Sequence, residues 1–160
     1  MLLSDLHEKA SRKGTYAAVR FSDDTLAYLE KLQHKLKVPN PHPKTKFHTT
    51  LLYSRKHLPN YEGAGKLNPS PLSDTDAKLE IWPSHKEGLF VLVLQYKCDW
   101  LEARHSFLME EHKAEYDFPD YIPHITLGYD IGDWKPDSFK IELSQPLELV
   151  QEYHEDLDLD

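Results

Sequence analysis

The chain has 160 residues, 39% of them hydrophobic and 29% charged, a balance typical of one globular domain with a sizeable core. Its formal net charge of −8 argues against a sequence-independent grip on long DNA or RNA, which needs a basic face. No segment reaches the roughly 18 to 20 apolar residues of a membrane span. The lone cysteine, Cys98, excludes an internal disulfide and fits a reducing compartment. We expect a single domain over residues 1–160, in the cytoplasm and without membrane contact.

The first half of the chain predicts two strands separated by a helix. Leucines at helical spacing follow an N-cap serine and two acidic residues, which is typical of a helix start. The expected elements are a strand over 15–21, a helix from Ser22 to about Lys37, a Pro-rich loop over 38–43, a strand over 47–53, and an irregular segment over 57–73.

The second half of the chain predicts a similar succession of strands and a helix. The segment 89–96 (LFVLVLQY) is almost continuously apolar, which indicates an interior strand of a sheet. The acidic end, 155–160, is expected to be a solvated and partly disordered tail. The expected elements are strands over 78–82 and 89–96, a helix over 100–115 capped by Asp99, a Pro-containing loop over 117–123, and strands over 124–129, 139–143 and 147–153.

The two halves repeat one another most clearly at two short motifs. Residues 48–54 read HTTLLYS and residues 124–130 read HITLGYD, so His, Thr, Leu and Tyr recur at the same four offsets. In each half a helix, a Pro-containing loop and a strand that opens with His follow one another. The pattern favours an α+β chain with internal two-fold pseudosymmetry.

The spacing of each motif gives it a chemical meaning. Side chains on a strand alternate faces, so His48 and Thr50 point the same way, as do His124 and Thr126. Cleaving an RNA-type diester through its 2′-hydroxyl needs a base and an acid, and histidine serves in both roles near neutral pH. The threonine hydroxyls stabilise charge on the non-bridging phosphate oxygens. These four residues are the predicted catalytic site.

A metal site is the competing interpretation. His48 and His124 with Asp130 or Asp117 are a conceivable zinc set. The sequence has no His-x-x-x-His pair beside an acid and no Cys pair, and the counterpart of Asp130 in the first motif is Ser54. The acid–base interpretation is preferred, and no metal or other cofactor is expected.

The pair of motifs resembles the 2H phosphoesterase superfamily, whose members carry two His-x-(Thr/Ser) motifs on a bilobal α+β fold. The segments 13–16 (KGTY), 38–41 (VPNP), 47–56 and 121–127 look like the phage anti-CBASS nucleases. Those enzymes degrade cyclic di- and trinucleotide second messengers that bacteria use to trigger abortive infection. The resemblance implies internal pseudo-two-fold symmetry, with antiparallel sheets lining a central cleft and helices outside.

The resemblance also implies a substrate and a reaction. The 3′–5′ bonds of cyclic di- and trinucleotides such as 3′,3′-cyclic GMP-AMP would be hydrolysed through a 2′,3′-cyclic phosphate to a 3′-phosphate. The catalytic roles carry over to His48, Thr50, His124 and Thr126, and which histidine is the base stays open. The location would be the host bacterial cytoplasm. The oligomeric state is open, and a homo-oligomer is compatible with the sequence.

Residues that contact the bases are harder to predict. Tyr16 matches a base-contacting position of the family, and an aromatic face stacks on any nucleobase. The family also uses acidic and aromatic residues near its C-terminus, and the resemblance makes Glu148, Glu152 and Tyr153 candidates there. Trp82 and Tyr116 are further candidates, with core packing as the alternative for Trp82.

Two other functions are kept as alternatives. One is a cellular 2H protein, either an RNA-end 2′,3′-cyclic phosphodiesterase or a 2′–5′ RNA ligase. The other is a sponge that binds cyclic nucleotides without cleaving them. The acidic surface weighs against long RNA, and the intact motifs weigh against pure sequestration.

Overall fold

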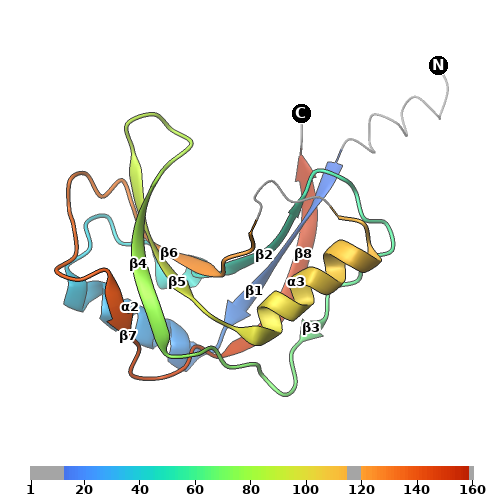
Figure 1. The fold of residues 1–160 in the computed structure, drawn as a ribbon, viewed down its shortest axis with the longest axis horizontal. Helices are drawn as coiled ribbons and strands as arrows, with labels where there is room; N and C mark the ends of the chain where they lie inside the picture. Colours follow the sequence, from blue (N-terminus) through green and yellow to red (C-terminus); the bar gives the residue numbers. More distant parts are fainter. Residues whose placement is uncertain (1–12, 115–119, 159–160) are drawn as a thin grey trace.

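The structure is a computed structural model that describes residues 13–114 and 120–158, and these residues form two antiparallel four-stranded sheets. The first sheet has the order β2-β1-β8-β3 and the second the order β6-β5-β4-β7 (Figure 1). The predicted α+β class is confirmed as a mixed fold of two sheets and two helices in the described part. The elements are β1 (Lys13–Phe21), α2 (Asp23–Leu36), a 3-10 turn (Lys44–Lys46), β2 (Thr49–Ser54), β3 (Gly65–Lys66), β4 (Asp76–Pro83), β5 (Phe90–Tyr96), α3 (Asp99–Glu111), β6 (His124–Tyr129), β7 (Lys140–Glu142) and β8 (Leu149–Asp158).

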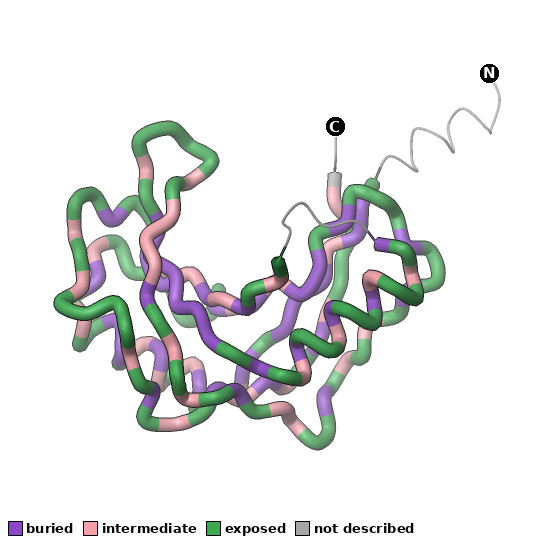
Figure 2. Tube along the Cα trace, in the orientation of Figure 1, coloured by how far each residue is buried: buried purple, intermediate pink, exposed green. Residues whose placement is uncertain are grey.

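The interior strands of the sheets carry most of the core. Six of the seven residues of β5 are buried, which confirms the interior position predicted from its apolar run. Buried chain runs through the strands of both sheets in Figure 2, and exposed chain is concentrated in the loops. Neither helix in the described part is long and apolar enough to cross a membrane.

The two motif strands, β2 and β6, each lie at the edge of a different sheet. Each has one irregularity in its pairing, and it falls at the same place. The register of β2 with β1 skips Leu51, and the register of β6 with β5 skips Leu127, in both cases the third residue after the motif histidine. A bulge at this point leaves the first three motif residues in regular alternation and re-aims those that follow.

Each helix lies against the sheet to which it is not directly joined. The helix α2 follows β1 but lies beside the second sheet, and α3 follows β5 but lies against the first (Figure 1). The amide of Gln33 in α2 donates to the carbonyl of Leu127 at 2.7 Å, and His105 Nδ1 in α3 donates to the carbonyl of Leu51 at 2.8 Å. Because edge strands leave backbone groups unpaired, these two bonds satisfy the bulged residue of each motif strand.

One of the two predicted helix caps is present in the structure. Ser22 caps α2 as predicted, and its hydroxyl accepts from the backbone N–H of Thr25 at 3.2 Å. The cap of α3 is Cys98, and the predicted cap, Asp99, is instead the first helical residue. A carboxylate there is still favourable because it faces the positive end of the helix dipole.

The Pro-rich loop 38–43 crosses from α2 to the second motif strand. The backbone N–H of His42 donates to the carbonyl of Leu127 at 2.9 Å, and Pro41 forms an isolated bridge with Gly128. A Cβ at Gly128 would lie only 2.5 Å from the Val38 side chain, so the close approach of the loop requires glycine. The loop thus joins the chain before the first motif to the second motif.

The C-terminal segment differs from its prediction. Residues 155–158 continue β8 and pair with the first residues of β1, so the expectation of a partly disordered tail is wrong there. The exposure of Glu155 and Asp156 agrees with the solvated part of that prediction. The pairing prevails because the ladder with β1 satisfies the backbone groups of this stretch that face β1. The irregular segment 57–73 also contains a short strand, β3.

Candidate active site

The predicted alternation in the two motifs is present in the structure. His48 and Thr50 are half-buried, whereas Thr49 between them is fully buried. His124 and Thr126 are half-buried around the fully buried Ile125. In each motif the histidine and the last threonine therefore share the accessible face of the strand.

A buried threonine joins the two motifs directly. Thr49 Oγ1 donates to the backbone carbonyl of His124 at 3.0 Å. Since a hydroxyl has one proton, the Tyr96 hydroxyl, 2.6 Å from the same oxygen, is the donor to Thr49. The Tyr121 hydroxyl also donates to the carbonyl of Thr50 at 2.8 Å. These bonds hold β2 and β6 side by side, so the four predicted catalytic residues belong to one site.

The two motif histidines make the same backbone contact. His48 Nδ1 lies 2.8 Å from the carbonyl of Lys46, and His124 Nδ1 lies 3.0 Å from the carbonyl of Ile122. A carbonyl oxygen only accepts, so Nδ1 of each ring carries the proton and donates. The nitrogen that each ring offers to a ligand is therefore Nε2. When the ring is neutral Nε2 is a base, and when the ring is protonated Nε2 is an acid.

The environment of His124 favours its neutral form. Burial lowers the pKa of His124 below the usual 6.5, the hydrogen bond to Ile122 opposes this, and the charge of His48 lowers the pKa further. The ring of Trp82 packs edge-on against His124, with 4.6 Å between ring centroids. Trp82 is half-buried and in contact with the site, so the structure places this predicted residue beside the second motif.

Tyr16 lies beside the first motif. Its hydroxyl is 3.1 Å from Thr50 Oγ1, and its ring centroid is 6.5 Å from that of His48. Burial raises the pKa of Tyr16 to about 12, and Tyr153 and Glu155 are close enough to contribute. Tyr16 therefore stays protonated and supplies a hydroxyl and an aromatic face to this side of the site.

The structure does not place Glu152 in the site. In the pairing of β8 with β1, Tyr153 lies opposite Ala18 and shares the face of Tyr16, so the neighbouring Glu152 points to the other face. There its carboxylate, which is 1% exposed, accepts from Arg104 at 2.7 and 2.9 Å and from the Tyr61 hydroxyl at 2.6 Å. A buried and fully paired carboxylate is a structural group, and Tyr153 takes its place as the site-facing residue of β8.

Three further points concern candidate residues and the metal interpretation. The candidate Tyr116 lies outside the described residues. His42 lies beside both motif strands, with its ring centroid 6.5 Å from that of Phe47 and 6.4 Å from that of Tyr129. Burial lowers the pKa of His42, and the charge of His48 lowers it further. Among residues 13–114 and 120–158, no three His, Cys, Asp or Glu residues are grouped as a metal-ion site would require.

Two residues of the site were missed by sequence reasoning. Thr49 was treated as the variable position of His-x-Thr, although a β-branched polar residue there was a usable signal. Tyr96 was hidden within an apolar strand, and only the tertiary structure brings it to Thr49.

Comparison with known proteins identifies the family. Residues 13–160 match the family described as Anti-CBASS protein Acb1. The protein of that name from Enterobacteria phage T4 is 40% identical over 147 residues, covering 92% of this chain and 90% of the relative. The one from Salmonella phage S16 is 39% identical over 90% of this chain and 88% of the relative. The one from Acinetobacter phage Ac42 is 37% identical over 99% of this chain and 97% of the relative. The chain belongs to the Anti-CBASS protein Acb1 family.

Proposed function

We propose that the protein is a metal-independent phosphodiesterase of the 2H type that hydrolyses the 3′–5′ bonds of cyclic di- and trinucleotides. The observation that carries the proposal is the matched setting of His48 and His124. Each ring is fixed by Nδ1 to a backbone carbonyl and offers Nε2 to a ligand. Two such nitrogens beside two threonine hydroxyls are the groups that cleavage through a 2′-hydroxyl needs.

The assignment of base and acid rests on the environment of the His124 ring. His124 has a lowered pKa and is neutral at neutral pH, so its Nε2 is ready to accept a proton. We assign the base to His124 and the acid to His48. The 2′-oxygen attacks phosphorus as its proton passes to His124, and the 5′-oxygen leaves with a proton from His48. Water then opens the 2′,3′-cyclic phosphate to a 3′-phosphate with the two roles exchanged.

Thr50 and Thr126 complete the proposed site. Each hydroxyl shares the accessible face of its strand with the motif histidine. There each hydroxyl would donate to a non-bridging oxygen of the phosphate and stabilise the charge that builds up during attack. In this arrangement Tyr16, which is hydrogen-bonded to Thr50, fixes that hydroxyl and presents its ring to a base.

The choice of substrate is supported by the family. The relatives are named for their action against CBASS, the bacterial defence that signals with cyclic oligonucleotides. The edge positions of β2 and β6 and the matched bulges support a 2H-type fold with two related halves. The cytoplasm of an infected bacterium is where such a protein would meet its substrate.

One experiment tests the proposal. The purified protein is incubated with 3′,3′-cyclic GMP-AMP in excess EDTA, and the products are resolved by chromatography and mass spectrometry. We expect linear products ending in a 3′-phosphate, lost in His48→Ala and in His124→Ala. His34→Ala is the matched control because His34 is exposed on α2, away from the motifs. Ligand that stays bound but intact would identify a sponge, and loss of activity with EDTA would overturn the metal-independent mechanism.

A further inference from the structure

A row of polar side chains crosses the second sheet from the catalytic histidine. In the strand register His124 of β6 lies opposite Gln95 of β5, Gln95 lies opposite Lys78 of β4, and Lys78 lies opposite Lys140 of β7. Residues paired across neighbouring strands point to the same face of a sheet. His124, Gln95 and the two lysines therefore form one continuous line on the face that carries the second motif.

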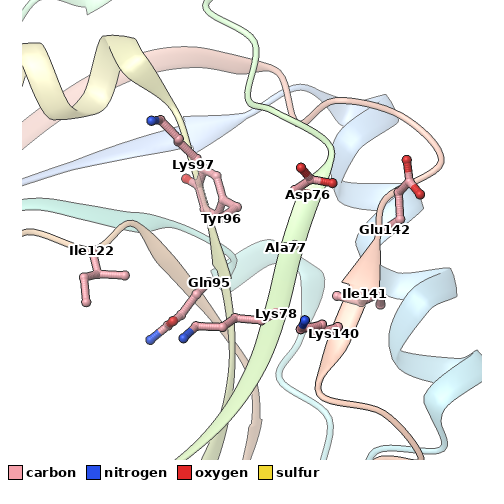
Figure 3. A pocket seen from close by; sticks show the side chains of 10 residues that line it. All are labelled: Asp76, Ala77, Lys78, Gln95, Tyr96, Lys97, Ile122, Lys140, Ile141 and Glu142. Carbon is pink, nitrogen blue, oxygen red and sulfur yellow. The ribbon is translucent and has the colours of Figure 1, made fainter.

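Gln95, Lys78 and Lys140 of this row also line a pocket of about 550 Å³. Ile122, whose carbonyl accepts from the His124 ring, is also part of the lining, so the pocket lies next to the second motif. In Figure 3 the Lys78 side chain extends along the sheet toward the amide of Gln95. The volume is within the range of pockets that hold small ligands, about 300 to 1,000 Å³.

The charges in the pocket are arranged unevenly. Asp76 lies opposite Glu142 at the start of β4, two residues before the pair formed by Lys78 and Lys140. The carboxylates thus occupy one end of the pocket. Of its three lysines, Lys78 and Lys140 lie in the row that leads to His124, and Lys97 lies outside that row. Lys78 forms an ion pair with Glu80 at 3.3 Å, and the two side chains are 56% and 38% exposed. Such an exposed pair contributes little and exchanges readily for a ligand.

We propose that Lys78 and Lys140 bind a second phosphate of the substrate, the one that is not being cleaved at the two histidines. This inference rests on the proposed function. Two strand spacings, about 10 Å, separate the backbones of His124 and Lys78, and the flexible stem of a lysine covers part of that distance. Gln95, between them, has two N–H donors for the intervening sugar or phosphate oxygens. The enzyme would in this way prefer a substrate with two or more phosphates.

The test compares two substrates that differ in the number of phosphates. The first is 3′,3′-cyclic GMP-AMP, with two diesters, and the second is adenylyl-(3′→5′)-guanosine, with the same bases and one diester. In Lys78→Ala/Lys140→Ala we expect KM for the cyclic substrate to rise roughly tenfold. KM for the one-diester substrate should stay within about twofold of the wild-type value. In Lys78→Arg/Lys140→Arg, KM for the cyclic substrate should stay near the wild-type value, because the charge is kept.

The control is Lys31→Ala/Lys35→Ala, which removes the same charge from exposed positions on α2. We expect this control to leave KM for both substrates unchanged. An equal rise in KM for both substrates in the Lys78→Ala/Lys140→Ala variant would indicate a structural role and overturn the inference. An unchanged KM for both substrates would also overturn it. If the wild-type protein cleaves neither substrate, the proposed function itself fails, which is distinct from a failure of the lysines alone.

Discussion

Thr49 and His124 are joined by a hydrogen bond of 3.0 Å from the buried threonine hydroxyl to the backbone carbonyl of the histidine. The two residues belong to edge strands of different sheets. No backbone ladder joins β2 to β6 in the described pairing, so this side-chain contact, together with the bond from Tyr121 to Thr50, sets the distance between the two motifs. The middle residue of the first motif is therefore a positioning residue for the second.

Thr49→Val should loosen the site while keeping the shape of the core. Valine has the same outline but cannot donate, so the His124 carbonyl and the Tyr96 hydroxyl lose their partner. We expect the free energy of unfolding to fall by about 1 to 3 kcal/mol, and kcat to fall because the histidines no longer hold their spacing. Urea unfolding and steady-state kinetics measure the two effects.

The control is Ile125→Val, which changes the equally buried position of the second motif. It removes one methylene and no hydrogen bond, at a cost of about 1 kcal/mol, and kcat should not change. Thr49→Ser, which keeps the hydroxyl, should retain most of the wild-type kcat. A Thr49→Val protein with the wild-type kcat would show that the bond does not set the geometry of the site.

The pH dependence should reflect the lowered pKa of His124. A base must be unprotonated, so a pKa below 6.5 keeps His124 active as the pH falls, and the acid limb of kcat/KM should lie below pH 6.5. Because the charge of His48 contributes to this shift, His48→Gln should raise the pKa of His124. NMR titration of the His124 ring in both proteins checks this without requiring activity. An unchanged or lower value in His48→Gln would contradict it.

The sequence predicted the part of the site that depends only on local periodicity. Alternation along a strand was enough to put His48 with Thr50 and His124 with Thr126, and it holds because the bulges begin after the threonines. The repeat of the two motifs was also enough to expect them in one site. Local order needs no knowledge of which strand pairs with which.

Pairing register is what the sequence could not supply. Glu152 and Tyr153 are neighbours, and only the register with β1 decides which of them faces Tyr16. The same holds for the row from His124 to Lys140, whose members come from four separate strands. The crossed positions of α2 and α3 depend on contacts between distant segments, such as the bond from Gln33 to Leu127, which no local pattern reveals.

The Arg104–Glu152 pair should matter for stability and not for catalysis. Burial alone would raise the pKa of Glu152, but hydrogen bonds from Arg104, Tyr61 and the Ala64 N–H lower it below 4.5. Since the folded pKa is the lower one, this stabilisation is present above pH 4.5 and is lost as the pH falls through the folded value. Arg104→Met leaves a buried carboxylate without its counter-charge, and we expect unfolding to become easier by about 3 to 5 kcal/mol at pH 7.

The companion variant is Arg104→Met/Glu152→Gln, which removes the charge along with its partner. Thermal or urea unfolding should show that it recovers part of the stability lost in Arg104→Met. In both variants kcat and KM per folded molecule should match the wild-type values, because Glu152 points away from the histidines. A KM change confined to variants of Glu152 would return this residue to the list of ligand contacts.

Trp82 should report on the site through its contact with His124, whose ring lies 4.6 Å from its own. If the indole also stacks on a base of the substrate, Trp82→Ala should weaken binding by about 1 to 3 kcal/mol, which is roughly 5- to 150-fold in Kd. The binding assay uses His48→Ala as the background, so that the ligand is not consumed.

Nucleotide binding should quench the tryptophan fluorescence, and the quench should disappear in Trp82→Phe. Trp134→Phe is the matched control, because Trp134 lies in the segment between β6 and β7, away from the motif histidines. Unaltered Kd in Trp82→Ala, with the quench retained in Trp82→Phe, would limit Trp82 to packing against His124.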